Sequence, residues 1–112
     1  MRNIDEQLAI LEGCTLPTAE RPLRIAEFDE LFSTALRAQT RLSPEMLRWS
    51  LDPRAEAVAR ALAARETQCC SFFAFTFASE GETLQMDVRV PAVQTEVLDA
   101  LAARAAARMR TR

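Results

Sequence analysis

The chain has 112 residues, enough for one domain with a single hydrophobic core. Hydrophobic residues make up 49% and charged residues 27% of the sequence, a balance that excludes an intrinsically disordered chain. The net charge of -2 at pH 7 provides no clustered basic surface, so we expect no nucleic-acid partner.

The sequence also lacks membrane signals. No stretch approaches the roughly 20 apolar residues that span a bilayer, and the N-terminal run MRNIDEQ has no apolar signal core. We therefore expect a cytoplasmic protein with no membrane partner. Every basic residue is an arginine and alanine is abundant, which indicates the coding bias of a GC-rich bacterium.

The first predicted element is a short helix over residues 3–12. Asn3 is a suitable N-cap with Glu6 three residues later, and Gly13 ends the helix. We interpret residues 1–13 as an N-terminal helical extension of a single domain, residues 1–112. A proline-bounded loop follows. A second helix begins near Pro22 and has a wide apolar stripe, made of Ile25, Phe28, Leu31, Phe32, Ala35 and Leu36.

The second half of the chain has the pattern strand, helix, strand, strand, helix. Residues 47–51 alternate apolar and polar side chains, and Asp52 and Pro53 then begin a helix that runs to a pair of cysteines. Residues 71–79 and 83–90 form a hairpin around Gly81, and Pro91 opens the last helix. These elements predict an α+β fold: a three-stranded antiparallel sheet whose third strand lies between the first two, with the helices packed on one face.

One polar residue interrupts the apolar pattern of the third helix. Ala55, Val58, Ala59 and Leu62 share a helix face, and Glu66 is the next residue on it. Burying a carboxylate without a partner costs several kcal/mol or shifts its pKa. Glu66 therefore predicts a neighbouring cation, a hydrogen-bond network or a functional cavity, although Arg24, Arg54 or Arg65 are also available as surface partners.

Three cysteines, Cys14, Cys69 and Cys70, are the main candidates for chemistry. Glu66 precedes the adjacent pair by three and four residues, the spacings that bring helical side chains together. A disulfide between neighbours would form a strained ring, so an intramolecular disulfide should join Cys14 to one of the pair. The chain has no histidine, and thiolates without imidazole suit soft ions such as mercury, arsenic, copper(I) or zinc. A purely structural cysteine pair is equally compatible with this spacing.

The motifs Cys-Thr-Leu, beginning at Cys14, and Glu-Thr-Gln-Cys-Cys-Ser-Phe, beginning at Glu66, resemble a group of small actinobacterial proteins with a C-x-L … E-x-x-C-C-x-F pattern. The resemblance covers residues 14–105, and many members have proline where this chain has Ser71. The group is uncharacterised and is associated loosely with heavy-metal-responsive regulators, including those for mercury. It implies a site made of Glu66 and the three cysteines.

These observations predict a small thiol protein that binds a soft metal or metalloid ion, with Cys14, Cys69 and Cys70 as ligands and Glu66 beside them. Its partner is then a metal ion or a thiophilic small molecule, and the sequence allows a homodimer. One alternative is an enzyme in which a cysteine is the nucleophile and Glu66 transfers a proton, acting on an organometal or other thiophilic substrate. Another is a thiol redox sensor.

Overall fold

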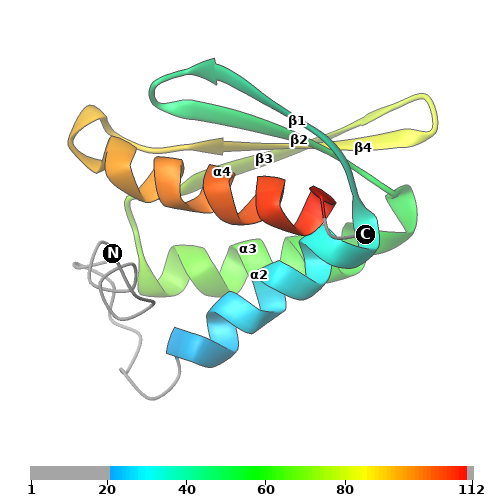
Figure 1. Cartoon of the computed structure of the whole chain (residues 1–112), viewed down its shortest axis with the longest axis horizontal. Coiled ribbons are helices and arrows are strands. Elements are labelled where there is room, and N and C mark those ends of the chain that lie inside the picture. The colour runs from blue at the N-terminus through cyan, green and yellow to red at the C-terminus, as the bar shows by residue number, and fades with distance from the viewer. Residues whose placement is uncertain (1–20, 111–112) are drawn as a thin grey trace.

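The computed structural model describes residues 21–110, which form an α+β fold (Figure 1). The predicted helix over residues 3–12 lies outside this range. The described elements are, in chain order, α2 (Arg21–Ala35), β1 (Leu36–Ser43), β2 (Met46–Leu51), the 3-10 turn η2 (Pro53–Ala55), α3 (Glu56–Cys69), β3 (Ala74–Glu80), β4 (Thr83–Arg89), the 3-10 turn η3 (Ala92–Gln94) and α4 (Thr95–Arg110). Each predicted helix and strand in the described range is therefore present.

The sheet is antiparallel with the strand order β1-β2-β4-β3. The third predicted strand, β4, does lie between β2 and β3, as the sequence indicated. The prediction of three strands was wrong, because the chain between α2 and β2 forms a fourth strand, β1. This strand lacks an apolar alternation: only Leu36 is fully buried, and most of its other side chains are exposed.

Polar contacts hold β1 against α4. Gln39 pairs with Trp49 in the sheet register, and its side-chain oxygen accepts a hydrogen bond from the Trp49 indole at 2.7 Å. The Gln39 amide donates to the carbonyl of Ala102 at 3.0 Å, and Arg41 contacts Asp99 at 2.8 Å. Hydrogen bonds satisfy these inward-facing polar groups, so a strand forms where a hydrophobicity pattern is missing.

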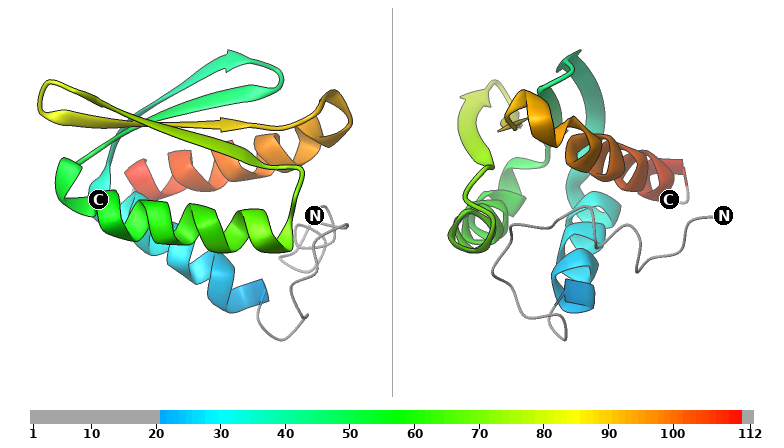
Figure 2. Two further views of the ribbon diagram at one scale, coloured as in Figure 1. Left: turned by 180° about the vertical axis from the view of Figure 1, so that it is seen from behind. Right: turned by 90° about the vertical axis from the view of Figure 1, so that its left-hand side faces the viewer.

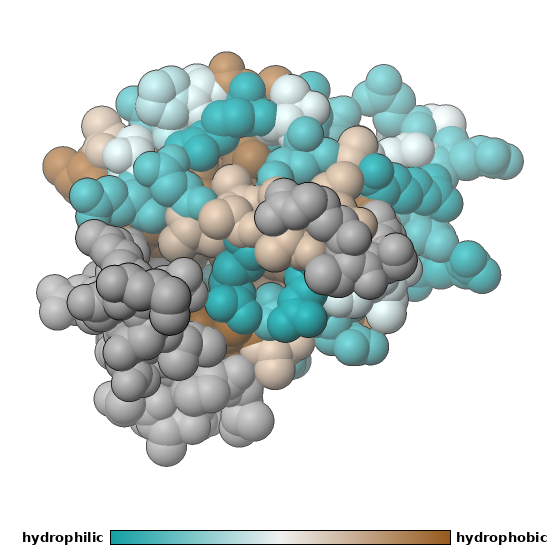
Figure 3. All heavy atoms as spheres, viewed as in Figure 1, coloured by the Kyte–Doolittle hydropathy of each residue, from teal (hydrophilic) through white to brown (hydrophobic). Residues whose placement is uncertain are grey.

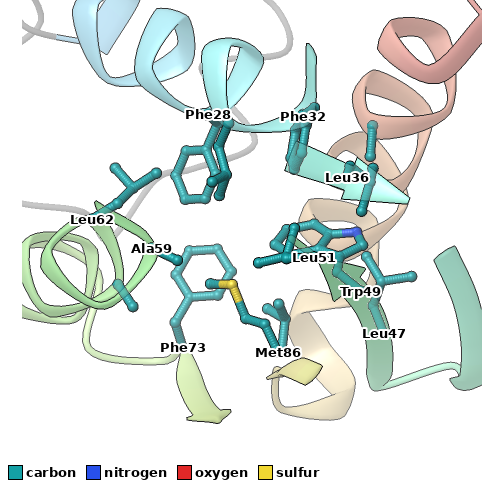
Figure 4. Close-up of a cluster of buried hydrophobic side chains, with 14 of the residues drawn as sticks. Phe28, Phe32, Leu36, Leu47, Trp49, Leu51, Ala59, Leu62, Phe73 and Met86 are labelled. Atoms are coloured by element: carbon teal, nitrogen blue, oxygen red, sulfur yellow. The ribbon is translucent and has the colours of Figure 1, made fainter. Parts of the chain in front are cut away.

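All three described helices lie on one side of the sheet, as Figure 2 shows and as the sequence predicted. The inner face of β2 and β4 is fully apolar and buried, because alternate residues point to it: Leu47, Trp49, Leu51, Leu84, Met86 and Val88. Phe32 of α2 meets Trp49 edge to face with ring centroids 4.9 Å apart. Phe28, Ala59 and Phe73 bring α2, α3 and the start of the hairpin into the same core (Figure 4).

The hairpin begins later than predicted. Cys70 leaves the helical conformation, with φ -126° and ψ 87°, and the amide of Phe73 donates to the carbonyl of Cys70 at 3.2 Å. This turn delays β3 to Ala74. Phe73 is buried, whereas Phe75 and Phe77 are only partly buried against the core. The turn matters for function because it places the cysteine pair where α3 stops.

No helix in residues 21–110 is long and apolar enough to cross a membrane. The face of the molecule seen in Figure 3 mixes hydrophilic side chains with smaller hydrophobic patches.

On the outer face of the sheet, Arg48 and Asp87 face each other across β2 and β4 and form a bidentate ion pair at 2.8 and 3.0 Å. Charged cross-strand pairs of this kind keep that face polar.

Candidate thiol site

The end of α3 carries the candidate residues that fall in the described range. The buried stripe of this helix runs through Ala59, Leu62 and Ala63 and reaches Glu66 one turn later. Glu66 is only 3% exposed, so the sequence correctly indicated a carboxylate in the core. Val58, which the sequence analysis put on the same apolar face, is instead 62% exposed, because the helix is rotated towards Ala63.

Arg24 of α2 is the partner of Glu66. Its Nη1 atom lies 2.5 Å from Oε2 of Glu66, and both side chains are largely buried, at 11% and 4% exposure. The same guanidinium lies 3.4 Å from Glu27, one turn further along α2, and is hydrogen-bonded to Cys69. Of the three arginines that the sequence offered, the structure therefore selects Arg24, and the pair is buried rather than on the surface.

Burial has opposite electrostatic consequences for the two partners. It raises the pKa of Glu66 above its usual value, because desolvation of the carboxylate outweighs the hydrogen bond and charge of Arg24. Burial alone would lower the pKa of Arg24, but the hydrogen bonds and negative charges of Glu66 and Cys69 outweigh it and raise that pKa. Arg24 thus stays charged between a carboxylate and a sulfur atom.

The two cysteines differ in state and in burial. Cys69 is a half-buried thiol beside Arg24, whereas Cys70 is fully buried and takes part in a disulfide bond. The partner of Cys70 lies outside the described residues, as does Cys14. The prediction that Cys14 lies close to Cys69 and Cys70 therefore concerns a residue outside the described range. Glu66, Cys69 and Cys70 lie within the last turn of α3 and the residue after it, and the amide of Cys70 donates to the carbonyl of Glu66 at 2.7 Å.

The donor groups of the described residues do not make a metal centre by themselves. Residues 21–110 contain no group of three or more histidine, cysteine, aspartate or glutamate side chains that could hold a metal ion. Oε2 of Glu66 already accepts from Arg24. The described part of the site consists of one thiol, one disulfide sulfur and a buried arginine-carboxylate pair.

An open groove of about 990 Å³ runs between α2 and α3. Ala26, Glu27, Glu30, Leu31, Thr34 and Ala35 line it from α2, and Asp52, Arg54, Ala55, Val58, Leu62 and Arg65 line it from the other side. At one end Arg65 forms an ion pair with Glu27, which also contacts Arg24. The sequence did not predict this groove, because it placed Val58 on the buried face of the helix. A small rotation of α3 instead exposes Val58 to the groove.

The chain matches no protein-family model, no curated protein and no solved structure at a level that would carry an argument.

Proposed function

We propose that this chain is a thiol protein that binds a soft metal or metalloid ion through the thiolates of Cys69, Cys70 and Cys14. The observation that carries the proposal is the buried guanidinium of Arg24, which contacts Cys69 and is fixed by Glu66. A thiolate is the form of cysteine that binds metals, and a neighbouring cation stabilises it. A structural cysteine in an apolar core has no need of such a cation.

The disulfide of Cys70 supports a third sulfur at the same site. A disulfide requires two sulfurs at bonding distance, and Cys69 retains its thiol. Cys14 is proposed as the third sulfur of the reduced site, as the sequence predicted, and reduction of the Cys70 disulfide releases a thiol next to Cys69.

The arrangement favours ions that accept three sulfur ligands. A tetrahedral zinc site needs a fourth ligand, and Glu66 is occupied by Arg24. Arsenic(III) and mercury(II) bind thiolates strongly without a fourth protein ligand. Three thiolates around either ion leave a neutral or singly negative cluster, and Arg24 lies where it balances residual negative charge.

The disulfide also favours one alternative, a redox sensor in which the Cys70 disulfide opens and closes. The enzymatic alternative has less support. A carboxyl group that protonates a ligand must reach it. Glu66 faces Arg24, and the guanidinium of Arg24 is the group that contacts the Cys69 sulfur.

The test is a titration of the fully reduced protein with mercury(II) and arsenic(III) against a competing dithiol. Native mass spectrometry should find one ion per chain. Substituting any of the three cysteines with serine should weaken binding by about 100-fold or more, because thiolate–metal bonds dominate the binding energy. The matched control is Glu66→Gln, which keeps all three sulfurs and should change affinity much less.

Unchanged affinity in the Cys69→Ser and Cys70→Ser proteins would overturn the proposal. Cys70 is fully buried, so a hydroxyl at this position could unfold the chain. Cys70→Ala removes the sulfur without burying a polar group, and circular dichroism would verify that both variants fold. If ions fail to bind but the thiol count still changes reversibly with oxidation, the redox sensor replaces the proposed function.

A further inference from the structure

The two edges of the sheet differ in how they are protected. β1, at one edge, carries Arg37 and Arg41 and has two irregularities in its register with β2. Charges and bulges are the usual devices that keep an edge strand from pairing with another chain. β3, at the other edge, pairs with β4 in an unbroken register from Ala74 to Glu80. It contains no proline, and no residue before Glu80 is charged, so this edge lacks such protection.

The free edge of β3 offers unpaired backbone groups. The amide of Val90 donates to the carbonyl of Glu45 at 2.9 Å, which continues the ladder between β2 and β4. By the alternation of an antiparallel ladder, even-numbered residues of β4 bond towards β2 and odd-numbered ones towards the even-numbered residues of β3. The backbone groups of Phe75, Phe77 and Ser79 therefore point to the free edge, where no strand of residues 21–110 pairs with them.

The side chains at this edge leave room for a neighbouring strand. The exposed side chains on its outer face before Glu80 are small: Ala74, Thr76 and Ala78. On the inner face Phe75 and Phe77 are only partly buried, and Arg60 of α3 stacks on the Phe77 ring at 4.6 Å, beside the same edge (Figure 2). A strand alongside β3 would meet no bulk on the outer face and would extend the apolar cover of both rings.

We propose that β3 pairs antiparallel with β3 of a second copy of this chain, so that two four-stranded sheets become one continuous sheet across a two-fold axis. The register that overlaps the whole of both strands is centred on Phe77, which then lies opposite Phe77 of the second copy. Phe75 faces Ser79 of the second copy in this register. Each outward-pointing residue thus meets another, which is the hydrogen-bonded arrangement of an antiparallel pair.

Charge is complementary in the same register. Glu80 lies opposite Ala74 of the second copy, and Arg89 of β4 is the register neighbour of Ala74. Glu80 and Arg89 of the second copy are then two strand spacings apart, about 10 Å, with only the Ala74 methyl group between them. Both side chains are exposed and long enough to meet over it. Within one chain these residues lie at opposite ends of the hairpin, so their ion pair requires two copies, and this self-complementarity selects a second copy over an unrelated strand.

The test is the oligomeric state of the full chain, measured by sedimentation equilibrium at pH 7 with a reductant that removes disulfides between chains. The wild type should be a dimer. Ser79→Pro removes the donor that faces Phe75 of the second copy and keeps the bonds to β4. It should raise the dimer dissociation constant by about 100-fold or more, because two interface hydrogen bonds are lost by symmetry.

The matched control is Ser71→Pro. Ser71 is also exposed but lies in the turn before β3, and the extended conformation of Cys70 before it tolerates a following proline. This variant should leave the dimer unchanged. Circular dichroism verifies that both proline variants fold.

Reversal of charge tests the register itself. Glu80→Arg or Arg89→Glu alone places like charges together at both ends of the interface and should weaken the dimer about tenfold. The double variant restores opposite charges between copies and should recover most of the affinity. Both side chains are exposed, so these variants decide the question even if Ser79→Pro does not fold.

A monomeric wild type would overturn the proposal and leave this edge to residues 1–20 or to a strand of another protein. A dimer that Ser79→Pro weakens no more than Ser71→Pro would place the interface elsewhere and overturn it too. Failure of the double charge variant to recover would have the same consequence. No metal enters these measurements, so their outcome is independent of the proposed function.

Discussion

Two nearly buried carboxylates on helices contact arginines, and they do so differently. Asp29 of α2 accepts three hydrogen bonds from α4: Arg104 donates to its two oxygens at 3.1 and 2.6 Å, and Arg108 donates at 3.0 Å. Glu66 of α3 has one arginine partner, Arg24, at 2.5 Å, and that arginine also contacts the thiol of Cys69.

The Glu66 contact differs in that its arginine is shared with a sulfur atom. Asp29 has a donor on each oxygen and ties α2 to α4. Arg24 divides its guanidinium between Glu66 and Cys69, so the state of the carboxylate affects the sulfur. Networks whose members share a donor are coupled in energy, whereas separate pairs behave additively.

Removing the Glu66 carboxylate should lower the free energy of unfolding more than removing the Asp29 carboxylate. Glu66→Ala leaves Arg24 charged and nearly buried, which costs about 3 kcal/mol of unfolding free energy. Asp29→Ala leaves Arg104 and Arg108, whose side chains are 23% and 45% exposed and can turn to water, so the cost is about 1 kcal/mol. Urea denaturation of both variants at pH 7 measures the difference.

A variant that removes charge without volume is the control for this comparison. Glu66→Gln keeps the shape of the side chain and a hydrogen-bond acceptor for Arg24, so it should be less destabilising than Glu66→Ala. Equal stability losses in Glu66→Ala and Asp29→Ala would show that the two carboxylates have the same structural role.

Arg24 should also control the reactivity of Cys69. Because the charged guanidinium of Arg24 is hydrogen-bonded to the sulfur, Arg24→Gln removes a charge-assisted contact and should slow alkylation of Cys69 by iodoacetamide at pH 7 by up to about tenfold. Arg24→Lys keeps the charge and should restore part of the rate. Arg104→Gln removes an arginine from the Asp29 pair and should leave the rate unchanged. The rates are measured by mass spectrometry of the peptide that contains Cys69.

The fold was predictable wherever an apolar alternation reaches the core. Trp49, Met86 and Val88 are fully buried on one sheet face, so β2 and β4 and their adjacency followed from the sequence. β1 was not predictable in this way, because its inner face carries Gln39 and Arg41, which use hydrogen bonds to Trp49 and α4 instead of apolar burial. A polar strand held by long-range contacts has no local signature.

The candidate site was predictable in part. Glu66 on an apolar stripe predicted a cation, a hydrogen-bond network or a cavity beside it, and the structure places the cation Arg24 there. The choice among three arginines depended on which helix packs beside α3, and that is a tertiary property. The distinction between Cys69 and Cys70 likewise depends on where α3 ends, since the turn at Cys70 buries one sulfur and leaves the other half-exposed.

The pH dependence of stability should identify Glu66. Burial raises its pKa in the folded chain, so folding favours its protonated form. Its contribution to stability is therefore greatest at low pH and is lost as the pH rises from the usual value of 4.5 through the raised value. As the pH rises from about 4 to about 8, the free energy of unfolding of the wild type should therefore fall relative to that of Glu66→Gln.

Asp52 provides a control of opposite sign. Hydrogen bonds from the side chain and backbone of Arg54 hold its pKa at about 2, below the usual 3.8, so the stability it contributes is lost as the pH falls through this window. Asp52→Asn should therefore change the pH dependence only below about pH 4. A pH dependence of Glu66→Gln parallel to that of the wild type would contradict the assignment to Glu66.

The smallest effect should separate the two arginines that hold Asp29. Arg108 donates one hydrogen bond to Asp29 and its side chain is 45% exposed, so loss of this contact in Arg108→Ala should change the unfolding free energy by only about 0.5 kcal/mol. Arg104 donates to both oxygens and is less exposed, so Arg104→Ala should cost about 1 kcal/mol, close to the cost of Asp29→Ala. Neither substitution should alter alkylation of Cys69. If Arg104→Ala slows that reaction, the Asp29 and Glu66 contacts form one network through α2, and Asp29 belongs with the thiol site.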